Sequence, residues 1–115
     1  MIRGDRRVLV FSAHAADFCS RAGGTIIRLV EAGSQVHIYD MTYGEKCESP
    51  ALWTRNPDYT LDEIKEIRRE EIKAAAAVLG ASVDCFDFGD SPLLLGPEQR
   101  HQLLEVIRTF RPDLI

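Results

Sequence analysis

The chain has 115 residues, a length that suits one domain or part of one. Its composition, with 45% hydrophobic and 28% charged residues, is ordinary for a globular protein, and its net charge of −4 leaves no basic surplus for nucleic acid or an anionic membrane. A small anionic substrate stays compatible with this charge, because it needs only a local positive site.

The cysteines and the N-terminal segment indicate where the protein works. Cys19, Cys47 and Cys85 form no close pair, so reduced thiols in a cytoplasmic protein are the default interpretation. The apolar stretch after the charged N-terminus is short and predicts a strand, not a signal peptide. No run reaches the roughly 18 apolar residues that cross a bilayer. We therefore expect a cytoplasmic protein with no membrane partner; a homo-oligomer is allowed but not required.

The first half of the chain alternates apolar runs with a helical pattern. Residues 7–13 form a short β-branched and apolar run that predicts a buried parallel strand. Apolar residues then recur at helical spacing over 18–32, and Gly33 ends the pattern. Residues 35–42 predict a second strand. The segment 43–59 carries Gly, Ser, Pro, Asn and charges without a clear period, and its length predicts a functional loop.

The second half continues this alternation. Thr60 and Glu63 fit a capping box at the start of a helix. The predicted elements are a helix over 60–79, a strand over 83–88, a loop over 88–97, a helix over 99–110 and the entry into a fourth strand after Pro112. Four residues of the last helix are expected to form one apolar stripe: Leu103, Leu104, Ile107 and Phe110.

Helices between short apolar strands predict a parallel sheet with right-handed crossovers, and therefore a three-layer, Rossmann-like α/β domain over 1–115. Ligands bind such sheets at the carboxyl ends of the strands, where the loops 13–18, 43–59 and 88–97 meet. The chain finishes on Pro-Asp-Leu-Ile, which looks like the entry into a strand. We therefore expect the N-terminal part of a longer protein, with the sheet truncated after the third predicted helix.

The first loop holds His14 and Asp17, an imidazole and a carboxylate that can face one metal ion. Zinc accepts such ligands and usually takes at least three from the protein. The alternative is a histidine that closes the strand and an Asp17 that caps the next helix. A nicotinamide site is disfavoured, because the glycine-rich fingerprint is absent after the first strand and Gly23-Gly24 come too late.

The other loops add candidates for proton chemistry and substrate contact. Glu45 and Glu48 follow the second strand, and either could act as a general base or lie in a solvated charged turn. Asp90 follows the third strand, where it could bond a substrate, orient a ligand or stabilise a turn. Arg68, early in the second helix, could reach a substrate carboxylate or belong to a solvated face.

Several separated blocks of sequence resemble the LmbE-like family of zinc proteins, also called the PIG-L deacetylase family. They are VLVFSAHAADFCSRAGGTIIRLVEAGSQVHIYDMTYGE, RREEIKAAAAVLGA and DFGDSPL, in the family's order. The family motif after the first strand is His-Pro-Asp-Asp-Glu, and the matching residues here run from His14 to Phe18. The resemblance implies zinc ligation by His14 and Asp17, with a further histidine ligand expected past residue 115. It also implies that the deacetylase base is missing, because Ala16 stands at its position.

Shorter blocks, RAGG, YGE, ES, LW and GDSP, resemble one hydratase branch of this family. The resemblance implies zinc-dependent conversion of 4-oxalomesaconate, or a close unsaturated oxo-tricarboxylate, to 4-carboxy-4-hydroxy-2-oxoadipate in gallate and protocatechuate breakdown. Glu48 is the first choice for the base and Glu45 the second, while Asp90 and Arg68 are expected to bind the substrate. The alternatives are a zinc deacetylase of N-acetylglucosaminyl compounds and an inactive truncated fragment.

Overall fold

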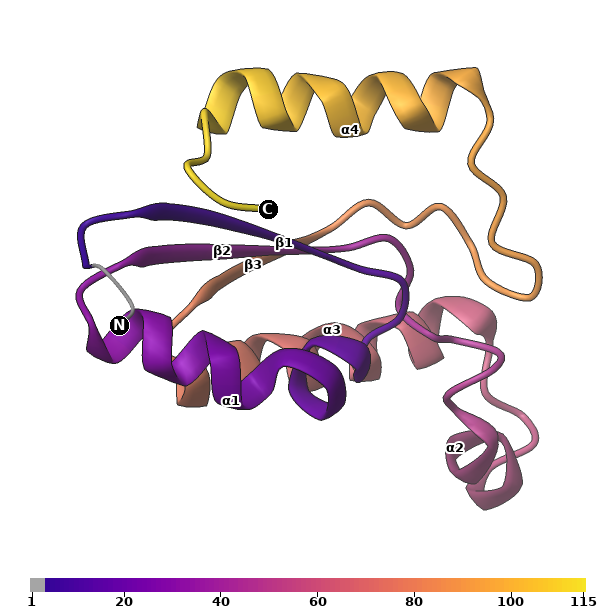
Figure 1. Cartoon of the computed structure of the whole chain (residues 1–115). Coiled ribbons are helices and arrows are strands. Elements are labelled where there is room, and N and C mark those ends of the chain that lie inside the picture. Colours follow the sequence, from indigo (N-terminus) through magenta and orange to yellow (C-terminus); the bar gives the residue numbers. More distant parts are fainter. Residues whose placement is uncertain (1–3) are drawn as a thin grey trace.

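A parallel sheet forms the middle of the molecule in the computed structural model, which describes residues 4–115 (Figure 1). Its strands are β1 (Arg7–Ser12), β2 (Gln35–Asp40) and β3 (Ser82–Cys85), in that order across the sheet. The register pairs Ser12 with Asp40 and Asp40 with Cys85, so the three strands end together at one edge. This is the edge at which the sequence placed the ligand-binding loops.

Helices cover both faces of the sheet. The helices α1 (Asp17–Glu31) and α3 (Leu61–Leu79) lie on one face, and α4 (Pro97–Phe110) lies over the other (Figure 1). The predicted three-layer α/β fold is therefore confirmed. No helix among residues 4–115 combines the length and apolar character that crossing a bilayer requires.

The side chains of β2 show that the α1–α3 face of the sheet is more deeply buried than the α4 face. Successive side chains of a strand point to opposite faces. Val36 and Ile38 are buried in the main core with Ile26 of α1 and Ile72 of α3, whereas His37 lies on the α4 side and is only half-buried. The main core therefore lies between the sheet and the α1–α3 layer, directly behind the first and second loops.

The strongest local signals in the sequence are confirmed. The helix α1 begins and ends within one residue of its predicted bounds. At the start of α3, the Thr60 N–H donates to Glu63 Oε2 at 2.7 Å and the Glu63 N–H donates to Thr60 Oγ1 at 3.2 Å, which is the predicted capping box. Gly80 then ends α3 in the left-handed conformation.

Four details of the prediction are wrong or incomplete. The predicted loop 43–59 contains a short helix, α2 (Pro50–Arg55), because Pro50 fits its first turn. The strand β3 ends at Cys85, although the N–H groups of Phe86 and Phe88 still donate hydrogen bonds to carbonyl groups at the end of β2 and just after it. Leu104 is 48% exposed and lies outside the half-buried side of α4, a helix that has no fully buried residue. The fourth strand is represented by one parallel bridge, between Val8 and Leu114.

Candidate metal centre

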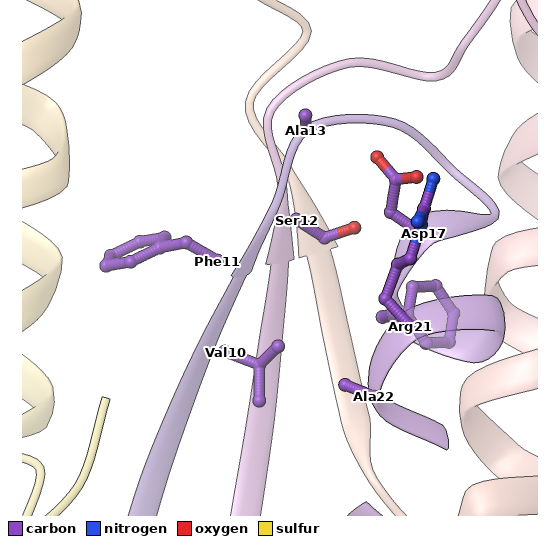
Figure 2. A pocket seen from close by; sticks show the side chains of 8 residues that line it. Val10, Phe11, Ser12, Ala13, Asp17, Arg21 and Ala22 are labelled. Atoms are coloured by element: carbon purple, nitrogen blue, oxygen red, sulfur yellow. The ribbon is translucent and has the colours of Figure 1, made fainter. Parts of the chain in front are cut away.

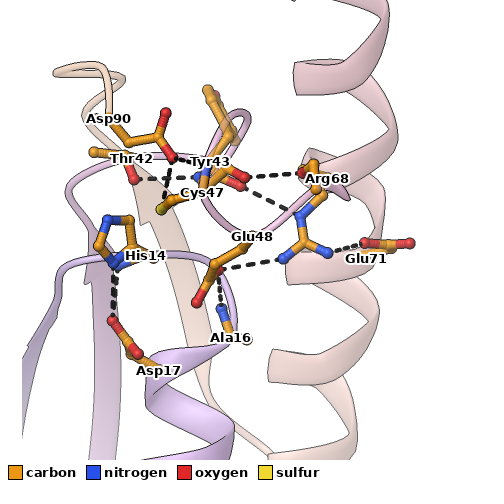
Figure 3. A network of polar contacts seen from close by, with 12 residues as sticks. His14, Ala16, Asp17, Thr42, Tyr43, Cys47, Glu48, Arg68, Glu71 and Asp90 are labelled. Carbon is orange, nitrogen blue, oxygen red and sulfur yellow. Dashed lines mark hydrogen bonds and ion pairs between the residues drawn. The ribbon is translucent and has the colours of Figure 1, made fainter. Parts of the chain in front are cut away.

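His14 and Asp17 face each other at the turn between β1 and α1 (Figure 3). Nδ1 of His14 lies 3.4 Å from Oδ2 of Asp17, and the same oxygen accepts a hydrogen bond from the His14 main-chain N–H at 3.1 Å. The Ser12 hydroxyl donates to the His14 carbonyl at 2.9 Å, which holds the turn. The N-cap residue of α1 is Ala16 and no side chain caps the helix, so the alternative in which Asp17 is the cap is wrong.

Glu48 comes from the second loop and lies beside this pair (Figure 3). Its Oε2 accepts a hydrogen bond from the Ala16 main-chain N–H at 3.1 Å and lies 3.4 Å from Nη2 of Arg68. Ligand atoms of His14, Asp17 and Glu48 all lie within 4.8 Å of one another. The Glu48 carboxylate, from the second loop, thus lies beside Ala16, whose own side chain has no group that could accept a proton.

The backbone after β2 determines where Glu48 lies. Gly44 has a φ of +65°, which favours glycine, and its carbonyl accepts the Glu48 N–H at 3.1 Å and the Ser49 hydroxyl at 2.8 Å. A Cβ atom on Gly44 would lie 2.6 Å from Oε2 of Glu48, so a larger residue would displace this carboxylate. Thr42 joins the two loops by donating to the Ala13 carbonyl at 3.0 Å.

Arg68 reaches the site from α3, but its guanidinium group is already engaged. Besides Glu48, it contacts Glu71 at 2.7 Å and donates from Nε to the Tyr43 carbonyl at 3.3 Å. Its side chain is only 15% exposed. Substrate contact by Arg68 therefore stays a prediction, while the contacts that it makes hold Glu48 in position.

Asp90, from the third loop, is buried and organises the second loop (Figure 3). Its oxygens accept hydrogen bonds from the Lys46 N–H at 3.1 Å, the Cys47 N–H at 2.9 Å and the Cys47 thiol at 2.9 Å. Burial by itself would raise the pKa of Asp90, but these hydrogen bonds outweigh burial and lower it. The predicted substrate contact is untested, and the observed contacts fit the other predicted role, which is orientation of neighbouring groups.

Glu45 lies behind the site. It belongs to neither of the two groups of possible metal ligands, which are His14–Asp17–Glu48 and His14–Cys47–Asp90. It is 1% exposed, its Oε1 accepts the Asp90 N–H at 3.3 Å, and its carbonyl accepts the indole N–H of Trp53 at 2.8 Å. Its Oε2 is buried without a hydrogen-bond partner among the described residues. Of the two glutamates proposed as a base, Glu48 is therefore the one that lies at the His14–Asp17 pair.

In the group His14–Asp17–Glu48, the spacing of His14 and Asp17 fits a zinc ion. Zinc–ligand bonds of about 2.0–2.2 Å in a tetrahedron separate neighbouring ligand atoms by about 3.4 Å, and His14 Nδ1 and Asp17 Oδ2 lie 3.4 Å apart. A second group combines His14 with Cys47 and Asp90. Without a metal, burial and the hydrogen bond to Asp90 raise the pKa of the Cys47 thiol to about 11, so metal binding through its sulfur would also break the hydrogen bond that the thiol donates to Asp90. The His14–Asp17–Glu48 group is therefore the better candidate.

Asp40 is a charged residue at this edge that the sequence analysis missed. It ends β2, is 0% exposed, and neither of its oxygens has a hydrogen-bond partner among the described residues. Burial raises the pKa of Asp40 to about 7; the nearby Ser12 hydroxyl opposes this shift, and the negative charges of Glu48 and Asp17 add to it. The signal was visible as a carboxylate that ends the apolar run VHIYD.

These observations define the class: a Rossmann-like α/β domain with a candidate metal centre at the carboxyl edge of its parallel sheet. The family model for PIG-L, described as GlcNAc-PI de-N-acetylase, matches residues 9–115. The chain belongs to this family, as its motifs predicted.

Relatives with known names include both hydratases and deacetylases. The chain is 42% identical over 110 residues to the 4-oxalmesaconate hydratase of Pseudomonas putida and 31% identical over 111 residues to the diacetylchitobiose deacetylase of Thermococcus kodakarensis, in each case over 96% of its length. It also matches the crystal structure of GalB, the 4-carboxy-2-hydroxymuconate hydratase from Pseudomonas putida, with a TM-score of 0.89 and 42% identity over 95% of the chain. The chain spans 42% and 39% of the two relatives' lengths and 45% of the GalB chain.

Proposed function

We propose that the protein adds water to 4-oxalomesaconate, or to a close unsaturated oxo-tricarboxylate, and forms 4-carboxy-4-hydroxy-2-oxoadipate in the breakdown of aromatic acids. The 42% identity to a 4-oxalmesaconate hydratase supports this reaction. Because the chain spans less than half of that relative, the proposal concerns the protein at its natural length. A cytoplasmic location fits the three free cysteines.

The observation that carries the proposal is the place of Glu48. Ala16 offers no group that could accept a proton, but its N–H holds Oε2 of Glu48 at 3.1 Å, next to His14 and Asp17. The other oxygen, Oε1, accepts no hydrogen bond within residues 4–115 and is available to a reacting water. The carboxylate next to the His14–Asp17 pair therefore comes from the second loop and not from residue 16, which suits a reaction other than amide hydrolysis.

Hydration requires a base and an acid on neighbouring carbons. As the water oxygen bonds to one carbon of the double bond, Glu48 takes the proton that the water releases, and the electron pair moves toward the second carbon. That carbon then receives a proton from a general acid, so that one water is added in full. Zinc held by His14 and Asp17 would act as a Lewis acid on the substrate's oxygen atoms.

Deacetylation is the second candidate function. The family description and the 31% identical diacetylchitobiose deacetylase favour it. In this site it would require Glu48, and not residue 16, to serve as the base toward an amide carbonyl. Ala16 therefore places deacetylation below hydration.

The test is an assay of the protein at its natural length, with 4-oxalomesaconate as the substrate and zinc present. Glu48→Gln is expected to lower kcat by about 10²–10⁴-fold, the usual contribution of a positioned acid or base. Glu70→Gln is the matched control, because this carboxylate is exposed on α3 and pairs with Lys73. A chelator should abolish turnover and added zinc should restore it.

Two results would contradict the proposal in different ways. Full activity of Glu48→Gln would remove Glu48 from the proton chemistry. Release of acetate from N,N′-diacetylchitobiose, with no hydration of 4-oxalomesaconate, would establish the second candidate instead.

A further inference from the structure

Three loops bring a second group of possible metal ligands together at the carboxyl edge of the sheet. His14 comes from the first loop, Cys47 from the second and Asp90 from the third, and their ligand atoms all lie within 4.8 Å of one another (Figure 3). This group differs from the His14–Asp17 pair because it includes a sulfur atom. Its donor set therefore suits a softer, more polarisable ion than nitrogen and oxygen alone do.

Cys47 and Asp90 are already in contact within this group. The Cys47 thiol and the Cys47 N–H both donate to Oδ2 of Asp90 at 2.9 Å. Asp90 is 3% exposed and its Oδ1 accepts the Lys46 N–H at 3.1 Å, so its carboxylate is fixed toward the second loop. The Cys47 residue is exposed, so an ion in solution can reach its sulfur. An ion that replaced the thiol proton would therefore find one sulfur and one oxygen ligand in place.

His14 belongs to both groups, but it can serve only one ion at a time. A neutral imidazole has one nitrogen with a free lone pair and one nitrogen that carries a proton. The Asp17 carboxylate lies at the turn between β1 and α1 (Figure 2), where its Oδ2 is 3.4 Å from Nδ1 of His14. A zinc ion held there would also repel a second divalent ion bound a few ångströms away. Occupation of one group therefore excludes occupation of the other.

The two groups should sort metal ions by softness. Zinc can bind the nitrogen of His14 and the carboxylate of Asp17 without loss of the hydrogen bond between Cys47 and Asp90. A softer ion such as Cd²⁺ gains more from a thiolate ligand, and this gain offsets the loss of that hydrogen bond. Competition for His14 then makes the second group a site of inhibition.

We propose that His14, Cys47 and Asp90 form a second metal site, which takes soft divalent ions and whose occupation removes His14 from the zinc centre. When Cd²⁺ binds, the S–H bond of Cys47 breaks, an S–Cd bond forms and the proton passes to the solvent, with no change of oxidation state. Oδ2 of Asp90, which accepted the hydrogen bond of that proton, becomes a ligand of the ion. Loss of turnover rests on the function proposed above, but metal binding at this site does not.

The binding experiment adds Cd²⁺ stepwise to the zinc-loaded protein at its natural length, up to one ion per chain. Thiolate-to-cadmium absorption in the ultraviolet reports the sulfur ligand, and elemental analysis of the desalted protein reports the zinc that remains. We expect the absorption to rise as zinc is released. Cys47→Ser should raise the Kd for Cd²⁺ by more than the roughly 10–100-fold that loss of an outer-shell partner costs, because it removes a ligand itself.

Cys19→Ser is the matched control, because Cys19 is also an exposed thiol but belongs to neither group of possible ligands. It should show the same absorption and the same release of zinc as the unaltered protein. Absorption that persists in Cys47→Ser would overturn the inference. Absorption without release of zinc would overturn it as well, because the thiol would then hold Cd²⁺ without His14.

Kinetics distinguish this inference from the proposed function. If the protein hydrates 4-oxalomesaconate, Cd²⁺ should inhibit the unaltered protein at a concentration at least roughly tenfold lower than it inhibits Cys47→Ser, each measured against its own rate without cadmium. Equal inhibition of the two proteins would overturn the second site and leave the reaction standing. If no hydration occurs but Cd²⁺ still displaces zinc through Cys47, the reaction proposed above is wrong and the second site stands.

Discussion

Cys47 lies next to the metal pair, yet its surroundings keep it as a thiol. Its Sγ donates to Oδ2 of Asp90 at 2.9 Å, and burial together with this contact raises the pKa of Cys47 to about 11. Metal binding through sulfur would remove the proton and would also remove a hydrogen bond that holds the second loop on Asp90. His14 and Asp17 offer a nitrogen and an oxygen atom to a metal without loss of the Cys47–Asp90 hydrogen bond.

We expect Co²⁺ bound in place of zinc to show no intense thiolate-to-cobalt absorption in the near ultraviolet. The reason is that His14 and Asp17, the residues proposed to hold the metal, supply only nitrogen and oxygen atoms. Cys47→Ser should leave both the spectrum and the cobalt affinity unchanged. A strong band that disappears in Cys47→Ser would show that the group containing Cys47 and Asp90 binds the metal.

Single residues also show what sequence reasoning can and cannot find. His14 and Asp17 lie on one turn, so their spacing alone brings them together. The choice between Glu45 and Glu48 depends on the backbone of Gly44, whose conformation no spacing rule reveals. The burial of Asp40 depends on how helices pack against the end of a strand, which is a property of the whole domain.

At the scale of elements, the loop between β2 and α2 is the part that makes the site. Gly44 and Gly89 both have positive φ, +65° and +82°. A Cβ on Gly44 would meet the Glu48 side chain, whereas a Cβ on Gly89 would meet nothing within 4 Å. A substitution at Gly89 therefore tests backbone strain alone, whereas a substitution at Gly44 also displaces Glu48.

We expect Gly89→Ala to lower the free energy of unfolding by about 1–2 kcal/mol, because alanine is forced into the left-handed region. Gly44→Ala should lower it by more, because its Cβ would also lie 2.9 Å from the Glu48 Cβ. Only Gly44→Ala should also lower kcat, by tenfold or more, as Oε2 of Glu48 moves from the Ala16 N–H. Urea unfolding and the hydration assay measure the two effects. Equal losses of kcat in both variants would show that strain alone is responsible.

The elements differ in how well their sequences predict them. The helix α3 has nineteen residues, a capping box and a terminal glycine, and these signals agree. The helix α2 has six residues and no buried side chain, so the apolar period that identifies a helix is missing. It exists because Pro50 starts a turn and the Trp53 indole is anchored on the Glu45 carbonyl, a tertiary contact.

For the molecule as a whole, Asp40 links the site to folding. Its pKa rises from 3.8 to about 7 in the folded chain. Well below pH 3.8 it is protonated in both states and has no effect on stability. As the pH rises toward 7 the unfolded chain loses this proton first, so the free energy of unfolding falls, by a few kcal/mol at most, and stays lower above pH 7.

We therefore expect Asp40→Asn to stabilise the metal-free protein at pH 8 and to change its stability little at pH 4. Asparagine has nearly the same shape but no charge to bury. Asp58→Asn, in an exposed loop, is the control and should give the same difference at both pH values. Urea titrations across this range measure the effect, and an equal shift for Asp40→Asn at pH 4 and pH 8 would exclude a titrating Asp40.

The global fold was predictable because its signals are repeated along the chain. Three apolar strands and the helices between them each indicate the same parallel sheet, and errors at single boundaries do not alter that conclusion. The position of α4, by contrast, could not be read from its apolar residues, since Leu104 belongs to the stripe and is nonetheless exposed.

The hydrogen bond from the Ala16 N–H to Glu48 also limits how this site can change its chemistry. Because the main chain makes the contact, any small neutral side chain at residue 16 is compatible with it. An aspartate there would place two carboxylates against each other, and it would disturb Glu48, the proposed base, before supplying a new one. If Glu48 is the base, conversion of this domain into a deacetylase of the common type is expected to need coordinated replacements at residues 16 and 48, and either replacement made first is expected to lower activity.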